Sequence, residues 1–244
     1  MRIDYDRISR RYDNHRRGGG PYLRKLVELA MACDAKRVLE IGAGTGLNTQ
    51  AFLSAHPCQL IALEPSSGML RKAKEKAIPA YWLQGSGLSL PLSEGSISFV
   101  FGVYVLHHLP DLGGLLHECA RVLQDGCAAF VTASADFIQR HPMNHYFPSF
   151  AEVDKARFQP IPAIEEGFRR AGFSEAGLER FVDAPRPIDS AYVDRVANRF
   201  ISTYDLIPPD EFEEGVRRLR ADVARTGRLE VDMEWESVAI WAWK

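Results

Sequence analysis

The sequence lacks the features that mark several large classes of protein. Its 244 residues hold 30 Lys and Arg against 32 Asp and Glu, which gives a formal net charge of −2. This near-equal number of basic and acidic residues argues against a dedicated binder of nucleic acid or of anionic membranes. No apolar run approaches the roughly 20 residues of a membrane span. The first residues, MRIDYDRISRRYD, are charged from the second position, so we expect neither a signal peptide nor a membrane anchor.

Cysteine is also scarce. The four cysteines form no CxxC pair and stand at positions 33, 58, 119 and 127. This pattern predicts a reduced, cytoplasmic protein without structural zinc. His141 and His145 are four residues apart, but they lie in a proline-containing segment where we interpret them as polar loop groups, so no metal site is predicted.

The sequence does contain a regular alternation of short apolar runs and helical patterns. The apolar runs lie at 38–41, 59–63, 81–83, 97–103 and 128–133, and helical spacing begins after Pro21, at Leu47, at Ser66 and at Leu112. Several of the runs are continuously apolar, which is typical of a parallel sheet covered by helices on both faces. We therefore expect a doubly wound α/β core, with a hinge at Gly18 to Gly20 before it.

The pattern changes after residue 135. We expect one domain over 1–244, made of an arm at 1–20, a cofactor-binding core at 21–135, an active-site loop at 136–162, a helix and strand of the core at 163–188, a helical substrate cover at 189–230 and a final, antiparallel strand at 231–244. The aromatic side chains of the loop and cover have two interpretations, a pocket for a small organic substrate or packing onto the sheet. We favour the pocket for Tyr146 and Phe147, and packing for Phe200.

One segment carries most of the chemical information. The stretch VLEIGAGTG at 38–46 places glycines at 42, 44 and 46 between a strand and a helix, where backbone must pass close to a ligand. Glu64 ends the next strand, 18 residues after Gly46, where a carboxylate can accept hydrogen bonds from both ribose hydroxyls. Together they predict an adenosine-type cofactor at the carboxyl edge of the sheet.

The spacing of the glycines separates the candidate cofactors. A dinucleotide fingerprint reads GxGxxG, whereas here the spacing is GxGxG and Leu47 stands in the sixth position. Glu40, two residues before the first glycine, is well placed for an ammonium group and badly placed for a phosphate. This pattern favours S-adenosylmethionine over NAD.

Taken together, these motifs resemble the class I S-adenosylmethionine-dependent methyltransferases, in particular the small-molecule group called methyltransferase type 11. The matching stretches are VLEIGAGTG at 38–46, LIALEPSSGML at 60–70, LQGSGLSLPLSEGSISFVFGVYVLHHL at 83–109 and RVLQDGCAAFVT at 121–132. The N-terminal YDRISRRYD resembles the arm that closes over the cofactor in this family. The resemblance implies a Rossmann-like, seven-stranded, mostly parallel sheet with an antiparallel last strand, and S-adenosylmethionine as cofactor.

The resemblance also assigns residues to the cofactor. These are Tyr12, Arg16, Glu40, Gly42, Ala43, Gly44, Gly46, Asn48, Glu64, Pro65, Met69, Gly85, Ser86, Gly87, Phe101, Gly102 and Val103. Glu64 would hold the ribose, Pro65 and Met69 would flank the adenine, and the strand end at 101–103 would line the methyl-donating end. Tyr12 and Arg16 would close from the arm, for which an ordinary amphipathic surface helix is the alternative.

Two positions bear on catalysis and affinity. Ser86 stands where the family usually has an Asp that accepts a bond from the adenine amino group. A serine hydroxyl carries no charge, so two alternatives remain: weaker adenine binding, or a water molecule that meets the amino group. His107 follows the fourth predicted strand and is a candidate general base, because histidine titrates near neutral pH. The LHHL run is common in this family, so a positional or helix-capping role is the alternative.

The sequence thus predicts a transferase that moves a methyl group by in-line displacement to a small organic acceptor, apolar or aromatic in part, with neither nucleic acid nor membrane as partner. Three alternatives remain: a non-catalytic protein of the same fold that binds S-adenosylmethionine or S-adenosylhomocysteine, a methyltransferase acting on RNA or protein, and, as the weakest, an NAD-linked oxidoreductase.

Overall fold

The computed structural model describes residues 3–14 and 16–244, and its contacts divide the chain into two compact units. The larger, here called the sheet unit, comprises Tyr5–Thr132, Gln159–Phe181 and Ser237–Lys244. The smaller, here called the helical unit, includes Ala133–Phe158 and Val182–Glu236. No helix in the described part of the chain is both long and apolar enough to cross a membrane. The single-domain organisation stays a prediction.

The sheet unit alternates strands and helices, as expected. Its elements are α1 (Tyr5–Ile8), the 3-10 helix η1 (Tyr12–Asn14), α2 (Leu23–Ala32), β1 (Arg37–Ile41), α3 (Leu47–Ala55), β2 (Gln59–Glu64), α4 (Ser67–Glu75), β3 (Tyr81–Gln84), β4 (Ile97–Val103), the 3-10 helix η2 (Leu106–His108), α5 (Leu112–Val122), β5 (Leu123–Thr132), α8 (Ile161–Arg170), β6 (Ser174–Val182) and β9 (Glu236–Trp243). Each of the five apolar runs forms a strand. Ser66 caps α4, because its Oγ accepts a hydrogen bond from the Met69 backbone N–H at 3.1 Å.

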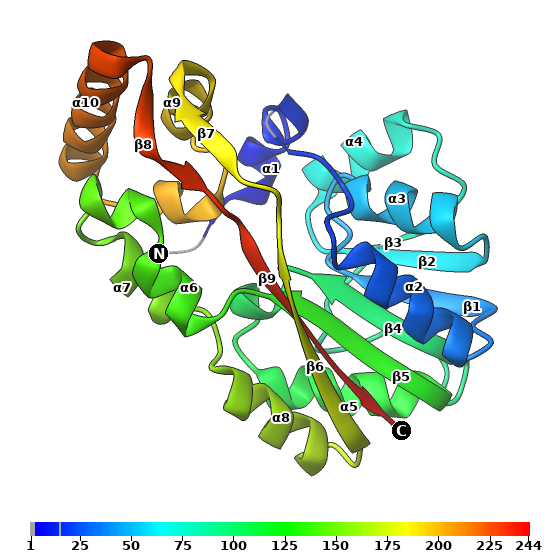
Figure 1. Ribbon diagram of the computed structural model, residues 1–244. Helices are drawn as coiled ribbons and strands as arrows, with labels where there is room; N and C mark the ends of the chain where they lie inside the picture. Colours follow the sequence, from blue (N-terminus) through cyan, green and yellow to red (C-terminus); the bar gives the residue numbers. More distant parts are fainter. Residues whose placement is uncertain (1–2, 15) are drawn as a thin grey trace. The chain divides into compact units, whose positions relative to one another are not determined.

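The strands form one seven-stranded sheet in the order β3-β2-β1-β4-β5-β9-β6 (Figure 1). The pairs β1–β2, β2–β3, β1–β4 and β4–β5 are parallel. β9 runs antiparallel to β5, with Cys127 opposite Trp243 and Thr132 opposite Val238. The expected doubly wound, mostly parallel sheet with an antiparallel last strand is confirmed.

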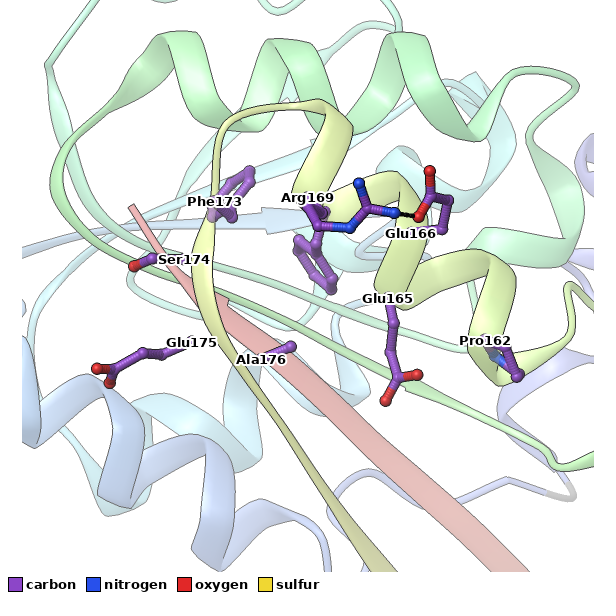
Figure 2. Close-up of a pocket in the computed structure, with 9 residues that line it drawn as sticks. Pro162, Glu165, Glu166, Arg169, Phe173, Ser174, Glu175 and Ala176 are labelled. Carbon is purple, nitrogen blue, oxygen red and sulfur yellow. Dashed lines mark ion pairs between the residues drawn. The ribbon is translucent and has the colours of Figure 1, made fainter.

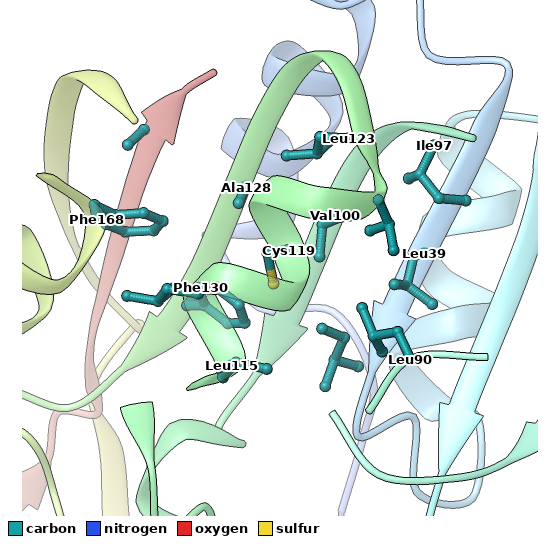
Figure 3. Close-up of a cluster of buried hydrophobic side chains, with 14 of the residues drawn as sticks. Leu39, Leu90, Ile97, Val100, Leu115, Cys119, Leu123, Ala128, Phe130 and Phe168 are labelled. Carbon is teal, nitrogen blue, oxygen red and sulfur yellow. The ribbon is translucent and has the colours of Figure 1, made fainter. Parts of the chain in front are cut away.

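Helices cover both faces of this sheet with separate apolar layers. On one face, Leu115 and Cys119 of α5 and Phe168 of α8 pack with Val100 and Phe130 of the strands (Figure 3). The other layer is built by α2 and α3 on β1 and β4. Fully burying one such aliphatic or aromatic side chain contributes about 1.5–3 kcal/mol, so these layers fix the positions of the strand ends at which the functional loops begin.

The triple glycine at 18–20 is not a hinge. A Cβ on Gly18 would lie 1.9 Å from the carbonyl oxygen of Leu47 in α3, so the chain passes directly against the helix backbone there. Gly19 has a φ of 69° and donates its backbone N–H to Asn48 Oδ1 at 3.0 Å. The glycines allow close contact rather than free movement, a distinction that composition alone does not make.

The helical unit contains more secondary structure than the sequence suggested. Its elements are α6 (Ala135–Arg140), the 3-10 helix η3 (Pro142–His145), α7 (Phe150–Lys155), β7 (Arg186–Asp189), α9 (Ser190–Ala197), the 3-10 helix η4 (Ser202–Asp205), α10 (Pro209–Thr226) and β8 (Arg228–Met233). The segment 136–162 is therefore not a loop. Its helices span only one or two turns each, which is too short to produce a hydrophobic period in the sequence.

The expected final strand at 231–244 is divided. β8 ends at Met233 and β9 begins at Glu236, and β8 pairs antiparallel with β7 in a separate two-stranded sheet. Neither β7 nor the pairing was expected. β8 reads RLEVDM and is mostly exposed, so it lacks the apolar run by which the other strands were found.

The core of the helical unit is aromatic and decides the two interpretations of these side chains. The Phe147 ring is fully buried, with its centroid 5.3 Å from that of Tyr204 and 5.8 Å from that of Phe212. Tyr146 is also buried, and its hydroxyl donates to Asp222 at 3.0 Å. The pocket prediction is therefore wrong for Phe147 and Tyr146. Phe200 is buried and packs against Tyr204 of the same unit, while packing onto the sheet stays a prediction.

Candidate functional site

The candidate site lies where the carboxyl ends of β1, β2 and β4 meet (Figure 1). The chain leaves β1 toward β2 on one side and β4 lies on the other, so this is a topological switch point of the sheet. Ligands of open α/β sheets bind outside the carboxyl ends of the strands at such points. The predicted cofactor residues come from the loops and first helical turns at this edge, and from the arm.

The glycine loop between β1 and α3 has a backbone conformation that residues with side chains rarely adopt. Gly42, Gly44 and Gly46 have φ values of 72°, 57° and 83°, a region that L residues rarely adopt. The Gly42 N–H donates to the carbonyl of Leu63 at 2.8 Å, which ties the start of the loop to β2. Among the described residues, a Cβ on Gly44 would meet only the Tyr12 hydroxyl, 4.0 Å away. The middle of the loop thus presents bare backbone.

Glu64 ends β2 beside this loop and is only 6% exposed. Its Oε2 accepts from the Gly44 N–H and its Oε1 from the Ser66 N–H, each at 2.9 Å. Burial raises the pKa of this carboxyl, and the two backbone hydrogen bonds oppose that rise. A carboxylate has about four acceptor positions, so Glu64 keeps capacity for two further donors, as a ribose diol requires.

Glu40 lies within β1 and is 1% exposed. Its Oε2 accepts from the Thr49 hydroxyl at 2.5 Å. Burial raises the pKa of Glu40 to about 8, against the lowering effect of Thr49. A buried acid is stable when protonated or when paired with a cation. The two carboxyl groups, as hydrogen-bond acceptors, therefore fit a ligand with an ammonium group and a ribose, as S-adenosylmethionine has.

The arm reaches this edge. Arg16 Nη1 donates to the Tyr12 hydroxyl at 2.6 Å, and its guanidinium lies 4.1 Å from the centroid of the Tyr12 ring. Asn48 Oδ1 accepts from the Gly19 N–H at 3.0 Å and from the Tyr22 hydroxyl at 3.1 Å. Asn48 therefore tethers the arm to α3, and its contact with a cofactor stays a prediction, as do those of Tyr12 and Arg16.

Two aspartates of the arm bind loops of the site and were missed by the sequence analysis. Asp6 Oδ1 accepts from the Ser66 hydroxyl and the Gly68 N–H, both at 2.6 Å, and these bonds hold the pKa of Asp6 below its usual value. Asp13 Oδ1 accepts from the Thr45 hydroxyl at 2.5 Å. A signal was present, since YDRISRRYD begins and ends with the same Tyr-Asp pair.

The residues predicted to contact the adenine differ in their exposure and in their contacts. Pro65 is exposed, whereas Met69 is buried. The Gln84 side-chain amide, not foreseen from the sequence, donates to the Pro65 carbonyl at 3.1 Å and links β3 to the loop after β2. Ser86 is exposed, and its Oγ accepts from the Leu88 N–H at 3.2 Å, so the hydroxyl oxygen supports its own turn between Gly85 and Gly87.

The end of β4 carries three of the predicted cofactor residues. The Phe101 ring is fully buried and lies 4.7 Å, centroid to centroid, from that of Phe52 in α3. Side chains alternate along a strand, so Phe101 shares the face of Phe99. It also pairs in register with Glu40 of β1, and its contact with a cofactor stays a prediction. A Cβ on Gly102 would lie 2.7 Å from Val105, and Val103 is buried, which leaves mainly backbone at this end of the strand.

Tyr104, the residue after β4, was also missed. It has a φ of 52°, which is uncommon for a bulky non-glycine residue and is often found at functional sites. Its hydroxyl shares a 2.8 Å hydrogen bond with the buried Ser237 hydroxyl, and its N–H donates to the carbonyl of Val131 at 2.8 Å. No signal in the sequence indicated this conformation.

His107 and His108 lie in η2, directly beyond this strand end. His107 is half-buried, and its ring centroid is 3.9 Å from that of His108. His108 Nε2 and the Tyr5 hydroxyl of the arm share a 2.6 Å hydrogen bond. His107 therefore reaches the correct edge for a base, while His108 is engaged by the arm.

A separate pocket of about 440 Å³ lies between α8 and the start of β6 (Figure 2). It includes Phe173, Ser174 and the acidic Glu165 and Glu175. Ser174 Oγ donates to the carbonyl of Trp243, which lies opposite the start of β5, so the pocket is at the amino edge of the sheet, opposite the glycine loop. Within the described residues, no three His, Cys, Asp or Glu side chains group as a metal site would require.

Comparisons with known proteins agree with this geometry. A family model described as "Methyltransferase domain" matches residues 39–131. An uncharacterized methyltransferase of Bacillus pumilus is 31% identical over an alignment of 188 positions, which covers 70% of this chain and 79% of that protein. The chain belongs to the class I S-adenosylmethionine-dependent methyltransferases, in the type 11 group. This methyltransferase is also 26% identical over 163 residues to the ubiquinone/menaquinone biosynthesis C-methyltransferase UbiE of Campylobacter jejuni, covering 60% of the chain and 66% of UbiE.

Other relatives match only in part. The biotin biosynthesis bifunctional protein BioHC of Cellvibrio japonicus is 35% identical over 100 residues, which are 41% of this methyltransferase and a fifth (20%) of BioHC. Among solved structures, a protein assigned as a methyltransferase of an antibiotic biosynthesis pathway in Anabaena variabilis has a TM-score of 0.71 at 21% identity, covering 89% and 96% of the two chains. Phosphoethanolamine N-methyltransferase 2 of Haemonchus contortus, solved with S-adenosyl-L-methionine, has a TM-score of 0.59 at 16% identity, covering 98% and 57%. These likenesses establish the fold.

Proposed function

We propose that this methyltransferase binds S-adenosylmethionine at the carboxyl edge of its sheet and transfers the methyl group to a small organic acceptor. The observation that carries the proposal is the pair of buried carboxyl groups, Glu40 and Glu64, on either side of the glycine loop. The two buried acids favour a ligand with a cation and hydroxyl donors, and Glu40 beside the glycine loop is badly placed for the phosphates of a dinucleotide.

Each part of the site has a distinct task under this proposal. Glu64 holds the ribose hydroxyls, Glu40 the ammonium group, and the bare backbone of Gly42 to Gly46 the methionine portion. Tyr12 covers the loop from the arm. The cofactor supplies a methyl group already activated on a sulfonium, so the chain has to hold the acceptor in line and exclude water.

A base is required only where the acceptor loses a proton. His107 is proposed for that task because it lies half-buried directly beyond β4. We expect His107→Ala to lower kcat by about 10²–10⁴-fold. The matched control is His117→Ala, an exposed position on α5. Unchanged turnover in the His107 variant would discard the base.

The class of acceptor is argued from charge and from the relatives. A net charge of −2 offers little to a polyanion such as RNA. The relatives whose names state a pathway act in the biosynthesis of biotin and of quinones, which are small molecules. No sequence-specific macromolecular contact is needed for such an acceptor.

The deciding experiment has two parts. Calorimetry with S-adenosylmethionine, S-adenosylhomocysteine and NAD is expected to give binding of both sulfur nucleosides and none of NAD, with Glu64→Gln weakening both by about tenfold or more. Labelled methyl transfer is then followed into a metabolite pool and, separately, into bulk RNA and protein. Failure to bind either sulfur nucleoside refutes the proposal, and label only in the macromolecules refutes the small acceptor.

A further inference from the structure

Thr45, in the middle of the glycine loop, is held from two directions. It is fully buried between Gly44 and Gly46. Its hydroxyl donates to Asp13 Oδ1 at 2.5 Å, and its carbonyl accepts from Lys76 Nζ at 2.7 Å. Lys76 and Asp13 also form an ion pair at 2.8 Å. Three residues from the arm, the loop and the end of α4 thus close a ring of polar contacts.

The turn after α4 is shaped to bring this lysine to the loop. Ala77, the next residue, has a φ of 51°, a conformation that costs energy in a non-glycine residue. Ile78 and Trp82 then pack so closely on the loop that a Cβ on Gly46 would lie within 2.8 Å of both. By contrast, Lys72 on the same helix pairs with its exposed neighbour Glu75. The α4–β3 connection therefore supports the glycine loop by both packing and charge.

The loop needs such support because of its composition. Three of its five residues are glycines, which lose more conformational freedom on ordering than any other residue. A ligand that binds a mobile loop has to order it, which weakens affinity. We propose that Asp13 and Lys76 are positioning residues that fix the glycine loop, through Thr45, in its ligand-binding shape before the cofactor arrives. The inference rests on the proposed function of this edge.

A simpler role for Asp13 would be to fasten the arm. The arm already has independent fastenings on either side of Asp13, at Asp6 on the Gly68 N–H and at Gly19 on Asn48. Lys76 in addition contacts the backbone of the loop itself. The ring of polar contacts among Asp13, Thr45 and Lys76 therefore acts on the glycine loop. Fixing the loop and fastening the arm predict different changes in hydrogen exchange.

The test uses hydrogen exchange of the ligand-free protein and calorimetry with S-adenosylhomocysteine. In Asp13→Asn and Lys76→Met, we expect exchange of peptides covering 42–47 to accelerate about tenfold or more, with β4 and β5 unchanged. The dissociation constant for S-adenosylhomocysteine should rise by about tenfold or more, the effect of losing a hydrogen bond to a charged group. The control is Lys36→Met, which breaks the exposed pair with Asp34 and should change neither quantity.

Three outcomes overturn the proposal. One is unchanged exchange at 42–47 in both variants, and another is faster exchange confined to the arm at 5–20. If the variants lose protection throughout the sheet unit, Thr45→Ser and Thr45→Val are compared, and equal exchange at the loop in these two is the third. If the wild-type protein binds no S-adenosylhomocysteine, the proposed function fails, while exchange at the loop still decides whether Asp13 and Lys76 fix it.

Discussion

Glu40→Gln replaces a buried carboxyl group with an amide of nearly the same shape. The amide oxygen can still accept the hydrogen bond that the Thr49 hydroxyl donates at 2.5 Å. The substitution therefore removes the ability to ionise while keeping the packing and this contact. It separates the cost of a buried negative charge from its use in binding a cation.

The magnitude follows from the pKa of Glu40, which burial raises from 4.5 to about 8. Between these values the folded protein keeps a proton that the unfolded chain has released, so the free energy of unfolding falls as the pH rises. Each unit of pKa difference corresponds to about 1.4 kcal/mol, so the total loss is about 5 kcal/mol at most. It is complete above the folded-state pKa.

The variant does not titrate at this position. Its free energy of unfolding should therefore match that of the wild type near pH 5 and exceed it by a few kcal/mol near pH 9. The assay is denaturant unfolding of both proteins across this range, with exposed Glu94→Gln as control. The same variant should lose affinity for S-adenosylmethionine, whose ammonium would no longer meet a carboxylate. Identical pH dependence in wild type and variant would refute the buried-charge argument.

Two substitutions test the packing corrections. Gly18→Ala places a Cβ 1.9 Å from the Leu47 carbonyl oxygen, so we expect a loss of about 1–3 kcal/mol in the free energy of unfolding and faster proteolysis of the arm. Gly113→Ala, where the nearest atom is 3.5 Å away, is the control, and equal stability in the two would restore the hinge. Phe147→Ala should cost about 3–5 kcal/mol and expose the helical unit to hydrogen exchange. Val231→Ala, at an exposed position, should change neither stability nor hydrogen exchange. A Phe147→Ala variant as stable as the wild type would favour the interpretation in which Phe147 lines a substrate pocket.

The core of the fold was predictable because its signals are local. Runs such as 38–41 and 97–103 are mostly apolar, and Ser66 stands at the one position where it can cap α4. The helical unit gave weaker signals. Its helices α6, η3 and α7 span four to six residues, and β8 carries as many polar as apolar residues, so its pairing with β7 depends on contacts between distant segments.

The candidate site likewise contains residues that local motifs predict and residues that only the fold brings together. The glycine loop, Glu40 and Glu64 were found because their types and spacing reflect contacts within one β-α-β unit. The contact of Phe101 with a cofactor stays a prediction, because a motif gives the position of a residue along a strand but not what its side chain contacts. Asp13 and Lys76 are 63 residues apart and approach each other only through the fold.

The sequence by itself determined the order of strands and helices in the sheet unit and the family, and it predicted the chemical kind of ligand. These depend on periodicity, on glycine spacing and on where acids stand relative to a strand end, all of which are read along the chain. Only the tertiary structure decided which side chains are buried, which glycines are in contact and which charges form pairs. Those properties depend on distances in space between residues that are remote in sequence, such as Gly18 and Leu47 or Asp13 and Lys76.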